Sequence, residues 1–172
     1  MKRLALLLAL LLPGCGLQPL YAGGARGPVA SALGSVEVRA IEGRAGWLMA
    51  NALRDRLGEP GGGPRYRLDV RLDDQITGLG IRRDDAVTRE RRSLRARYQL
   101  VDLSNGSVLL DATAGSDAGV DVIGSSEYAT IAAENTALER LSGIVADEIV
   151  QRLALYARGR PADRSDGVGP SR

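Results

Sequence analysis

Residues 65–73 alternate between polar and apolar side chains at every position. Tyr66, Leu68, Val70 and Leu72 are apolar, and charged residues separate them. Successive side chains of a β-strand point to opposite faces of the sheet, so this pattern predicts a strand with one buried and one wet face. A chain built around such a strand needs a second layer to cover the apolar face.

A second alternating segment follows at residues 87–103. Its apolar positions are Leu94, Ala96, Tyr98 and Leu100. This pattern predicts another half-buried strand, whose wet face would carry Arg91, Ser93, Arg95, Arg97 and Gln99.

The turn Ser104-Asn105-Gly106 allows two registers for the next strand, which is predicted from about residue 107 to 114. A two-residue turn would pair Leu100 with Asp111 and mix apolar and polar residues on one face. A three-residue loop pairs Leu100 with Leu110 and Tyr98 with Ala112, which keeps one face apolar. We therefore predict the second register, with Gly106 left-handed in a G1 bulge.

Two segments repeat apolar residues with a helical period. Residues 46–57 carry Met49, Leu53 and Leu57, and Gly58 ends this predicted helix. A longer final helix is predicted to begin at a cap formed by Ser125 or Ser126. Its apolar stripe consists of Ile131, Leu138, Leu141, Val145, Ile149, Leu153 and Tyr156.

A short strand is also predicted at residues 36–41, which gives the order β-α-β-β-β-α. Residues 74–86 are predicted to form a long polar connection, with Gly78-Leu79-Gly80 in a loop. The predicted fold class is α+β. It is a two-layer sandwich in which a mostly antiparallel four-stranded sheet is covered on one face by two helices.

The N-terminus has the features of an export signal. Lys2 and Arg3 precede an apolar run at residues 4–12, and Pro13-Gly14-Cys15 follows. Such a run makes about 14 Å of helix, roughly half of a bilayer core. Leu-Pro-Gly-Cys resembles the lipoprotein box of bacteria, which predicts a lipid on Cys15 as the chain's only covalent group. The alternative is an ordinary signal peptide followed by an incidental cysteine.

The expected organisation therefore has four parts. Residues 1–14 are a lipoprotein signal peptide, and 15–34 are the lipidated cysteine and a flexible tether. Residues 35–157 form a single domain. Residues 158–172 form a polar tail without regular structure.

Composition excludes most enzyme classes. The chain has no histidine, and its lysine, Lys2, and its cysteine, Cys15, both lie in the N-terminal export and lipidation segment. These absences argue against Ser-His-Asp triads, Ser-Lys pairs, zinc sites and bound cofactors. Carboxylate chemistry or a hard cation stays open at Asp73-Asp74 and Asp84-Asp85. The alternative is a solvated loop between two strands.

Charge also argues against nucleic acid as a partner. Lys2 and Arg3 account for two of the 23 basic residues, so the rest of the chain balances its 21 acidic residues. The wet face of the predicted sheet nevertheless holds a group of arginines, mixed with Asp69 and Asp73. These arginines are Arg65, Arg67, Arg71, Arg91, Arg95 and Arg97.

Four features together resemble the LptE family of lipopolysaccharide-assembly lipoproteins. They are the lipidated start CGLQPLY (15–21), the element order, the hairpin RARYQLVDLSNGSVLLDATA (95–114) and the final segment SSEYATIAAENTALERLSGIVADEIVQRLALYARG (125–159). The last resembles the alphaproteobacterial form of the family's final helix. The likeness covers nearly all of the chain after the signal.

This resemblance implies a non-enzymatic, lipid-anchored protein on the periplasmic side of the outer membrane. Family members plug and help to assemble the large LptD-type β-barrel that inserts lipopolysaccharide (LPS), and they contact LPS. The arginine-rich face would then contact the barrel or the phosphates of LPS, or it would be an ordinary solvated surface. An alternative is another outer-membrane lipoprotein that serves a transporter or activates a cell-wall synthase.

Overall fold

The alternating segments form one sheet in the computed structural model, which describes residues 27–58, 62–81, 87–122 and 126–159. The strands β1 (Val36–Val38), β2 (Tyr66–Ile81), β3 (Val87–Asp102) and β4 (Val108–Asp121) are neighbours in that order. β1 is parallel to β2, and the other pairs are antiparallel. The helices are α2 (Pro28–Leu33), α3 (Gly43–Leu57) and α4 (Glu127–Gly159).

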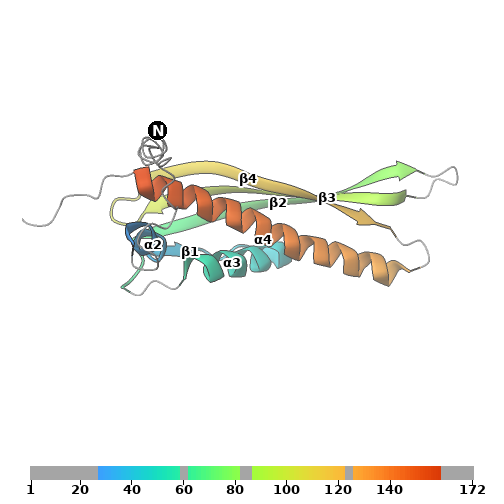
Figure 1. The fold of residues 1–172 in the computed structure, drawn as a ribbon, viewed down its shortest axis with the longest axis horizontal. Helices are drawn as coiled ribbons and strands as arrows, with labels where there is room; N and C mark the ends of the chain where they lie inside the picture. Colours follow the sequence, from blue (N-terminus) through green and yellow to red (C-terminus); the bar gives the residue numbers. More distant parts are fainter. Residues whose placement is uncertain (1–26, 59–61, 82–86, 123–125, 160–172) are drawn as a thin grey trace, which may run out of the picture.

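The helices lie on one face of the sheet, and α4 runs along the length of the molecule (Figure 1). α4 packs on β3 and β4, whereas α3 packs beside it against β1 and β2. The predicted α+β class with a covered and a wet face is therefore confirmed. The strand at 36–41 is shorter than predicted, and α3 begins before residue 46.

β2 is longer than the sequence predicted. Residues 74–81, expected in a polar connection, continue the strand and include Gly78-Leu79-Gly80. They pair with β3 as far as Ile81 opposite Val87. The prediction was wrong because Asp74 breaks the apolar alternation on the inner face, although strand pairing still satisfies the backbone. Residues 82–86 lie outside the described residues.

The β3–β4 hairpin has the predicted register, with Leu100 opposite Leu110 and Tyr98 opposite Ala112. Gly106 is left-handed, with φ 73°. The predicted bulge is misplaced, however, because the register shifts between Leu100 and Val101. The Asp102 N–H donates to the Ser107 carbonyl at 2.9 Å, so the turn is not the predicted three-residue loop.

A third helix corrects the predicted tether. Part of residues 15–34 forms α2, which packs against α4. Val29 and Leu33 are buried in the core, and Pro28 occupies the first turn, where its fixed φ favours a helix. Two apolar residues in a short segment rich in Gly, Ala and Pro give no periodic signal, so the sequence did not reveal this helix. Residues 1–26, with the expected signal and Cys15, lie outside the described residues.

α4 begins where predicted. The Ala129 N–H donates to the Ser126 hydroxyl at 3.2 Å, which makes Ser126 a cap, whereas Ser125 lies outside the described residues. The helix continues to Gly159, beyond the predicted domain end at 157. None of the described helices combines the length and the apolar character that crossing a membrane requires.

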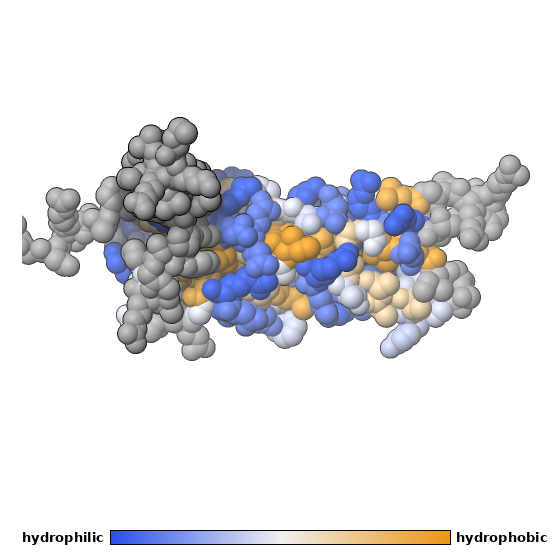
Figure 2. All heavy atoms as spheres, in the orientation of Figure 1, coloured by the Kyte–Doolittle hydropathy of each residue, from blue (hydrophilic) through white to orange (hydrophobic). Residues whose placement is uncertain are grey.

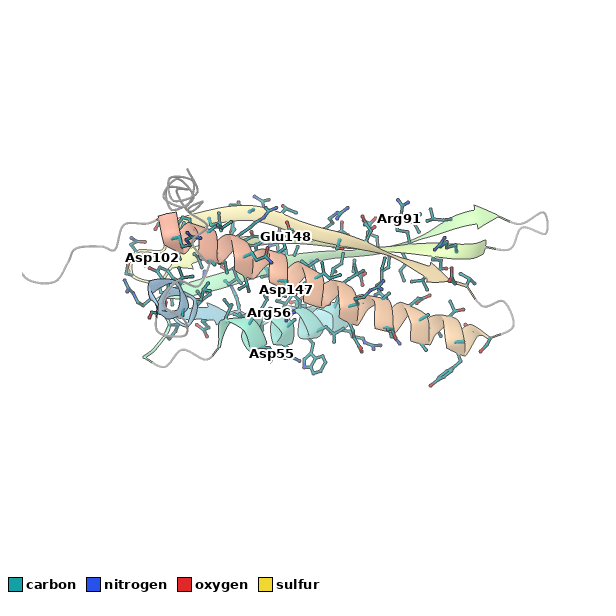
Figure 3. All side chains as sticks on the ribbon, viewed as in Figure 1. Asp55, Arg56, Arg91, Asp102, Asp147 and Glu148 are labelled. Carbon is teal, nitrogen blue, oxygen red and sulfur yellow. The ribbon has the colours of Figure 1, made fainter. Side chains whose placement is uncertain are left out.

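The core lies between the helices and the inner face of the sheet. Its fully buried side chains come from both layers and include Met49, Leu53, Leu68, Leu94, Tyr98, Leu141, Val145 and Ile149. The predicted stripe of α4 is buried from Leu138 to Leu153, whereas Ile131 is exposed. Arg56 and Asp147 join α3 to α4 (Figure 3), with Arg56 Nη2 donating to Asp147 Oδ2 at 3.1 Å.

Candidate functional site: the outer face of the sheet

The predicted arginines lie on the face of the sheet that the helices leave uncovered, which we call the outer face. Arg91, for example, points away from the helical layer (Figure 3). Register places Asp69, Arg71 and Asp73 of β2 opposite Gln99, Arg97 and Arg95 of β3, whereas Arg91 lies farther along β3, opposite Thr77. Arg65 immediately precedes β2, and its guanidinium lies 5.7 Å from the centre of the Tyr66 ring.

β3 and β4 form a ladder of ion pairs across the outer face. Arg97 Nη2 donates to Asp111 Oδ2 at 2.9 Å, and its Nε donates to Oδ1 at 3.1 Å. Arg95 lies 3.4 Å from Asp117, and Arg89 lies 3.5 Å from Asp121. Hydrogen bonds from Arg97 and Gln99 lower the pKa of Asp111 to about 2. These arginines are therefore neutralised by the neighbouring strand.

Gly115 explains why Arg95 can cross β4 toward Asp117. A Cβ at this glycine would lie 2.5 Å from Arg95 Cδ, so the arginine occupies the space that a side chain would fill. A hydrogen bond from Ser93 and the charge of Arg95 lower the pKa of Asp117. The Asp–Arg partnership across this hairpin was not recognised from the sequence, although the register predicted there places the two strands together.

β2 carries a second, local pair. Arg67 donates to both oxygens of Asp69 at 2.9–3.1 Å, and Arg39 lies 3.8 Å from the same carboxylate. Among the described residues, the side chains of three predicted arginines form no ion pair: Arg65, Arg71 and Arg91. Arg91 nevertheless lies close enough to Asp117 for its charge to lower the pKa of that carboxylate. The outer face thus combines arginines that pair with carboxylates and others, among them Arg71, that have no ion-pair partner among the described residues.

A polar hollow of about 640 Å³ opens beside Arg71. β2 and β3 contribute one wall, and the segment between β1 and α3 contributes the other. Its lining residues are Arg39, Ala40, Glu42, Asp69, Val70, Arg71, Arg97 and Gln99. Sequence reasoning missed Arg39 and Glu42, because nothing in their local pattern indicates that they approach β2.

Of the two predicted acidic pairs, only Asp73-Asp74 lies among the described residues, and its two side chains diverge. Asp73 and Asp74 lie in a strand rather than in a loop, so their side chains point to opposite faces. Asp73 accepts from Gln75 on the outer face, whereas Asp74 pairs with Arg92 on the inner face. Asp84 and Asp85 lie outside the described residues. The described residues hold no group of three or more side chains suited to a metal ion.

Arg92 is a buried charge that the sequence did not single out. Its Nε and Nη2 donate to Asp74 at 2.8 and 2.6 Å, and its Nη1 donates to the Glu134 carbonyl of α4 at 2.9 Å. Nearby, burial and the adjacent Glu134 raise the pKa of Glu90. Polar contacts therefore help to hold the first half of α4 on the sheet.

Figure 2 shows one side of the molecule, on which hydrophobic patches are separated by hydrophilic side chains. Trp47, Ile144 and Leu155 are exposed on the two larger helices. They lie on the helical layer, apart from the predicted arginines of the outer face. The outer face, with its arginines and its hollow, is therefore the best-defined candidate for recognition of a polar or anionic partner.

Comparison with known proteins places this geometry in context. A model of the LptE family, described as lipopolysaccharide-assembly, matches residues 33–153. No curated protein matches the chain. The structure of a lipoprotein from Caulobacter crescentus is 29% identical, and the match covers 78% of this chain and 100% of that one with a TM-score of 0.66.

Two further structures share the fold at low sequence identity. Rare lipoprotein B from Shewanella oneidensis is 11% identical over 73% of this chain and 96% of that one, with a TM-score of 0.57. A minor lipoprotein from Acinetobacter baumannii is 11% identical over 71% and 92%, with a TM-score of 0.56.

Proposed function

The chain belongs to the LptE family of lipopolysaccharide-assembly proteins, and we propose that it is the lipid-anchored partner and plug of an LptD-type β-barrel in the outer membrane. The family is not enzymatic, and its members act in LPS assembly. The match over residues 33–153 carries this proposal, because it includes most of α4 and all four strands.

The anchor in this proposal is Cys15. A single acyl chain binds a membrane only marginally, whereas more than one chain gives a stable attachment. A processed bacterial lipoprotein carries three, so Cys15 would hold the domain at the periplasmic side of the outer membrane. The domain begins at α2, whose first residue, Pro28, follows the anchor Cys15 by 13 positions, and its outer face would contact the barrel interior or LPS.

The outer face suits such surroundings chemically. The lumen of a large outer-membrane barrel is polar, and a face covered by paired arginine and aspartate side chains needs no apolar partner. Arginine also binds phosphate through two parallel hydrogen bonds. The pairs Arg95–Asp117 and Arg97–Asp111 limit how many of these cations are free to bind an anion.

Affinity purification in mild detergent from the native outer membrane tests the barrel partnership. We expect a large β-barrel in a one-to-one ratio with this chain, identified by mass spectrometry. A chain that purifies alone, or with a transporter or a cell-wall synthase, would contradict the proposal. Co-purification with a transporter or a cell-wall synthase would favour the alternative role of serving that protein.

LPS binding needs a separate measurement. A combined Arg91→Ala, Arg95→Ala and Arg97→Ala variant should bind LPS more weakly if the outer face contacts it. Because two of these changes leave Asp111 and Asp117 without their arginines, circular dichroism and thermal unfolding must show that the variant is folded. If a folded variant binds LPS with unchanged affinity, these three arginines do not contact LPS and serve only the structure of the domain.

A further inference from the structure

Arg71 lies directly opposite Arg97 on the outer face. Like charges at such a position are unfavourable, because the two Cβ atoms of a cross-strand pair are about 5 Å apart. Asp111 compensates Arg97 from the far side. Among the described residues no carboxylate pairs with Arg71, so this cation lies beside another cation without a counter-charge of its own.

A third guanidinium approaches Arg71 from the other direction. Arg39 follows β1, and its N–H donates to the Leu68 carbonyl at 3.2 Å, which is the last backbone bond between β1 and β2. Beyond this point no described strand pairs with this edge of β2, and the hollow opens between β2 and residues 39–42. Arg39, Arg71 and Arg97 therefore line one hollow from three separate segments.

The wall formed by residues 39–42 is held in place by close packing. A Cβ on Gly46 would lie 2.5 Å from the Ile41 carbonyl oxygen, so the first turns of α3 press directly on this segment. Ile41 itself packs against the core. The hollow is therefore bounded by backbone with a fixed position.

The lining of the hollow indicates the chemistry of its ligand. Alongside the three guanidiniums it carries acceptors on Asp69, Glu42 and Gln99, and the remaining lining residues are Ala40 and Val70. Arginine forks favour planar or tetrahedral oxyanions, and carboxylate and amide oxygens accept hydrogen bonds from hydroxyl groups. Acyl chains would find little apolar surface there.

We propose that this hollow binds a sugar that carries a phosphate or carboxylate group, with Arg71 as the principal contact to the oxyanion. Arg39 and Arg97 flank that group, and the hydroxyls of the sugar donate to Asp69, Glu42 or Gln99. The inference rests on the proposed function in taking this sugar from the saccharide part of LPS. It deepens that function by assigning the hollow to the saccharide and not to the acyl chains.

Isothermal titration of the lipidated full chain in mild detergent tests the site. The probes are deacylated, phosphorylated LPS saccharide, the same saccharide after phosphatase treatment, and inorganic phosphate. Arg71→Ala should weaken binding of the phosphorylated saccharide about tenfold or more, as expected for a lost charge-assisted hydrogen bond. Arg140→Ala is the matched control, because Arg140 is an exposed arginine of α4 that lies outside the hollow and is not one of the outer-face arginines.

The outcomes are distinguishable. Loss in Arg71→Ala with retention in Arg140→Ala supports the proposal, and Arg71→Lys should recover only part of the affinity because it lacks the fork. Equal losses in both variants, or no saccharide binding by the unaltered chain, would overturn it. Phosphate alone binding as tightly as the saccharide would overturn the sugar contacts. Co-purification of the unaltered chain with the barrel tests the proposed function separately, because it does not depend on saccharide binding at the hollow.

Discussion

Arg92 lies on the inner face of β3, where its side chain is only 10% exposed and donates to both oxygens of Asp74. Removing one partner of a buried pair leaves the other charge without compensation. We therefore expect Arg92→Ala to lower the free energy of unfolding by about 3 kcal/mol. The double variant Arg92→Met, Asp74→Leu should recover most of this loss. Urea unfolding measures both, and a neutral Arg92→Ala would contradict a structural role for the pair.

Two glycines inside helices predict opposite effects of the same substitution. Gly46→Ala places a Cβ against the Ile41 carbonyl and should cost about 1–3 kcal/mol. Gly143→Ala in α4 meets only Arg56 at 3.6 Å, so it should stabilise the protein by up to about 1 kcal/mol. Thermal unfolding of the two variants compares them directly. Equal effects would show that the contact at Gly46 relaxes without cost.

Glu90 predicts a pH dependence of stability. Its pKa is raised above the ordinary value of 4.5, first by burial and then by Glu134. An acid with a raised pKa holds its proton more tightly in the folded state, so its contribution favours folding below pH 4.5 and declines as pH rises through the raised value. Glu90→Gln should remove this decline and raise stability at neutral pH.

Urea midpoints at several pH values between 4.5 and 7.5 test this prediction. Glu139→Gln, at an exposed glutamate of the same helix as Glu134, is the control and should keep the slope of the unaltered protein. The lowered pKa values of Asp111 and Asp117 have the opposite effect on stability, because these ionised carboxylates favour folding. That contribution is lost only at lower pH, as the two aspartates become protonated. Identical slopes for the unaltered protein and Glu90→Gln would refute a contribution of Glu90 to the pH dependence of stability.

α2 shows at the level of an element that the domain begins before the predicted boundary. Leu33 is 4% exposed in the core, so Leu33→Ala should cost about 2–3 kcal/mol. Ser31→Ala, at an exposed position of the same helix, should have little effect. Deletion of residues 1–34 should destabilise the remaining chain for the same reason. A truncated chain as stable as the full one would restore the prediction of a flexible tether.

Elements with strict periodicity were predictable from the sequence. Tyr98 and Leu100 set the β3–β4 register because only one pairing keeps the inner face apolar. The extension of β2 was not predictable, since Asp74 is polar on the inner face and its partner Arg92 is distant in the sequence. In the candidate site, the outer arginines followed from alternation. The hollow did not, because it depends on how residues 39–42 lie beside β2.

The whole molecule has little net charge to attract it to an anionic membrane. From residue 4 onward the basic and acidic residues balance, and ion pairs neutralise much of the outer face. Each basic residue near an anionic surface contributes only about 1 kcal/mol, and nearby acids offset it. Membrane attachment should therefore depend on the lipid expected at Cys15.

A Cys15→Ser variant tests this dependence in the whole cell. We expect it to lose the mass of the lipid and to move from the membrane to the soluble periplasmic fraction, because the neutral domain cannot replace several acyl chains. Gly16→Ser keeps Cys15 and should stay in the outer membrane. Gly16→Asp should remain lipidated but be held in the inner membrane, as an aspartate at this position does in bacterial lipoproteins. Unchanged mass and fractionation of Cys15→Ser would refute lipidation, whereas loss of the lipid with continued outer-membrane attachment would mean that the barrel itself retains the domain.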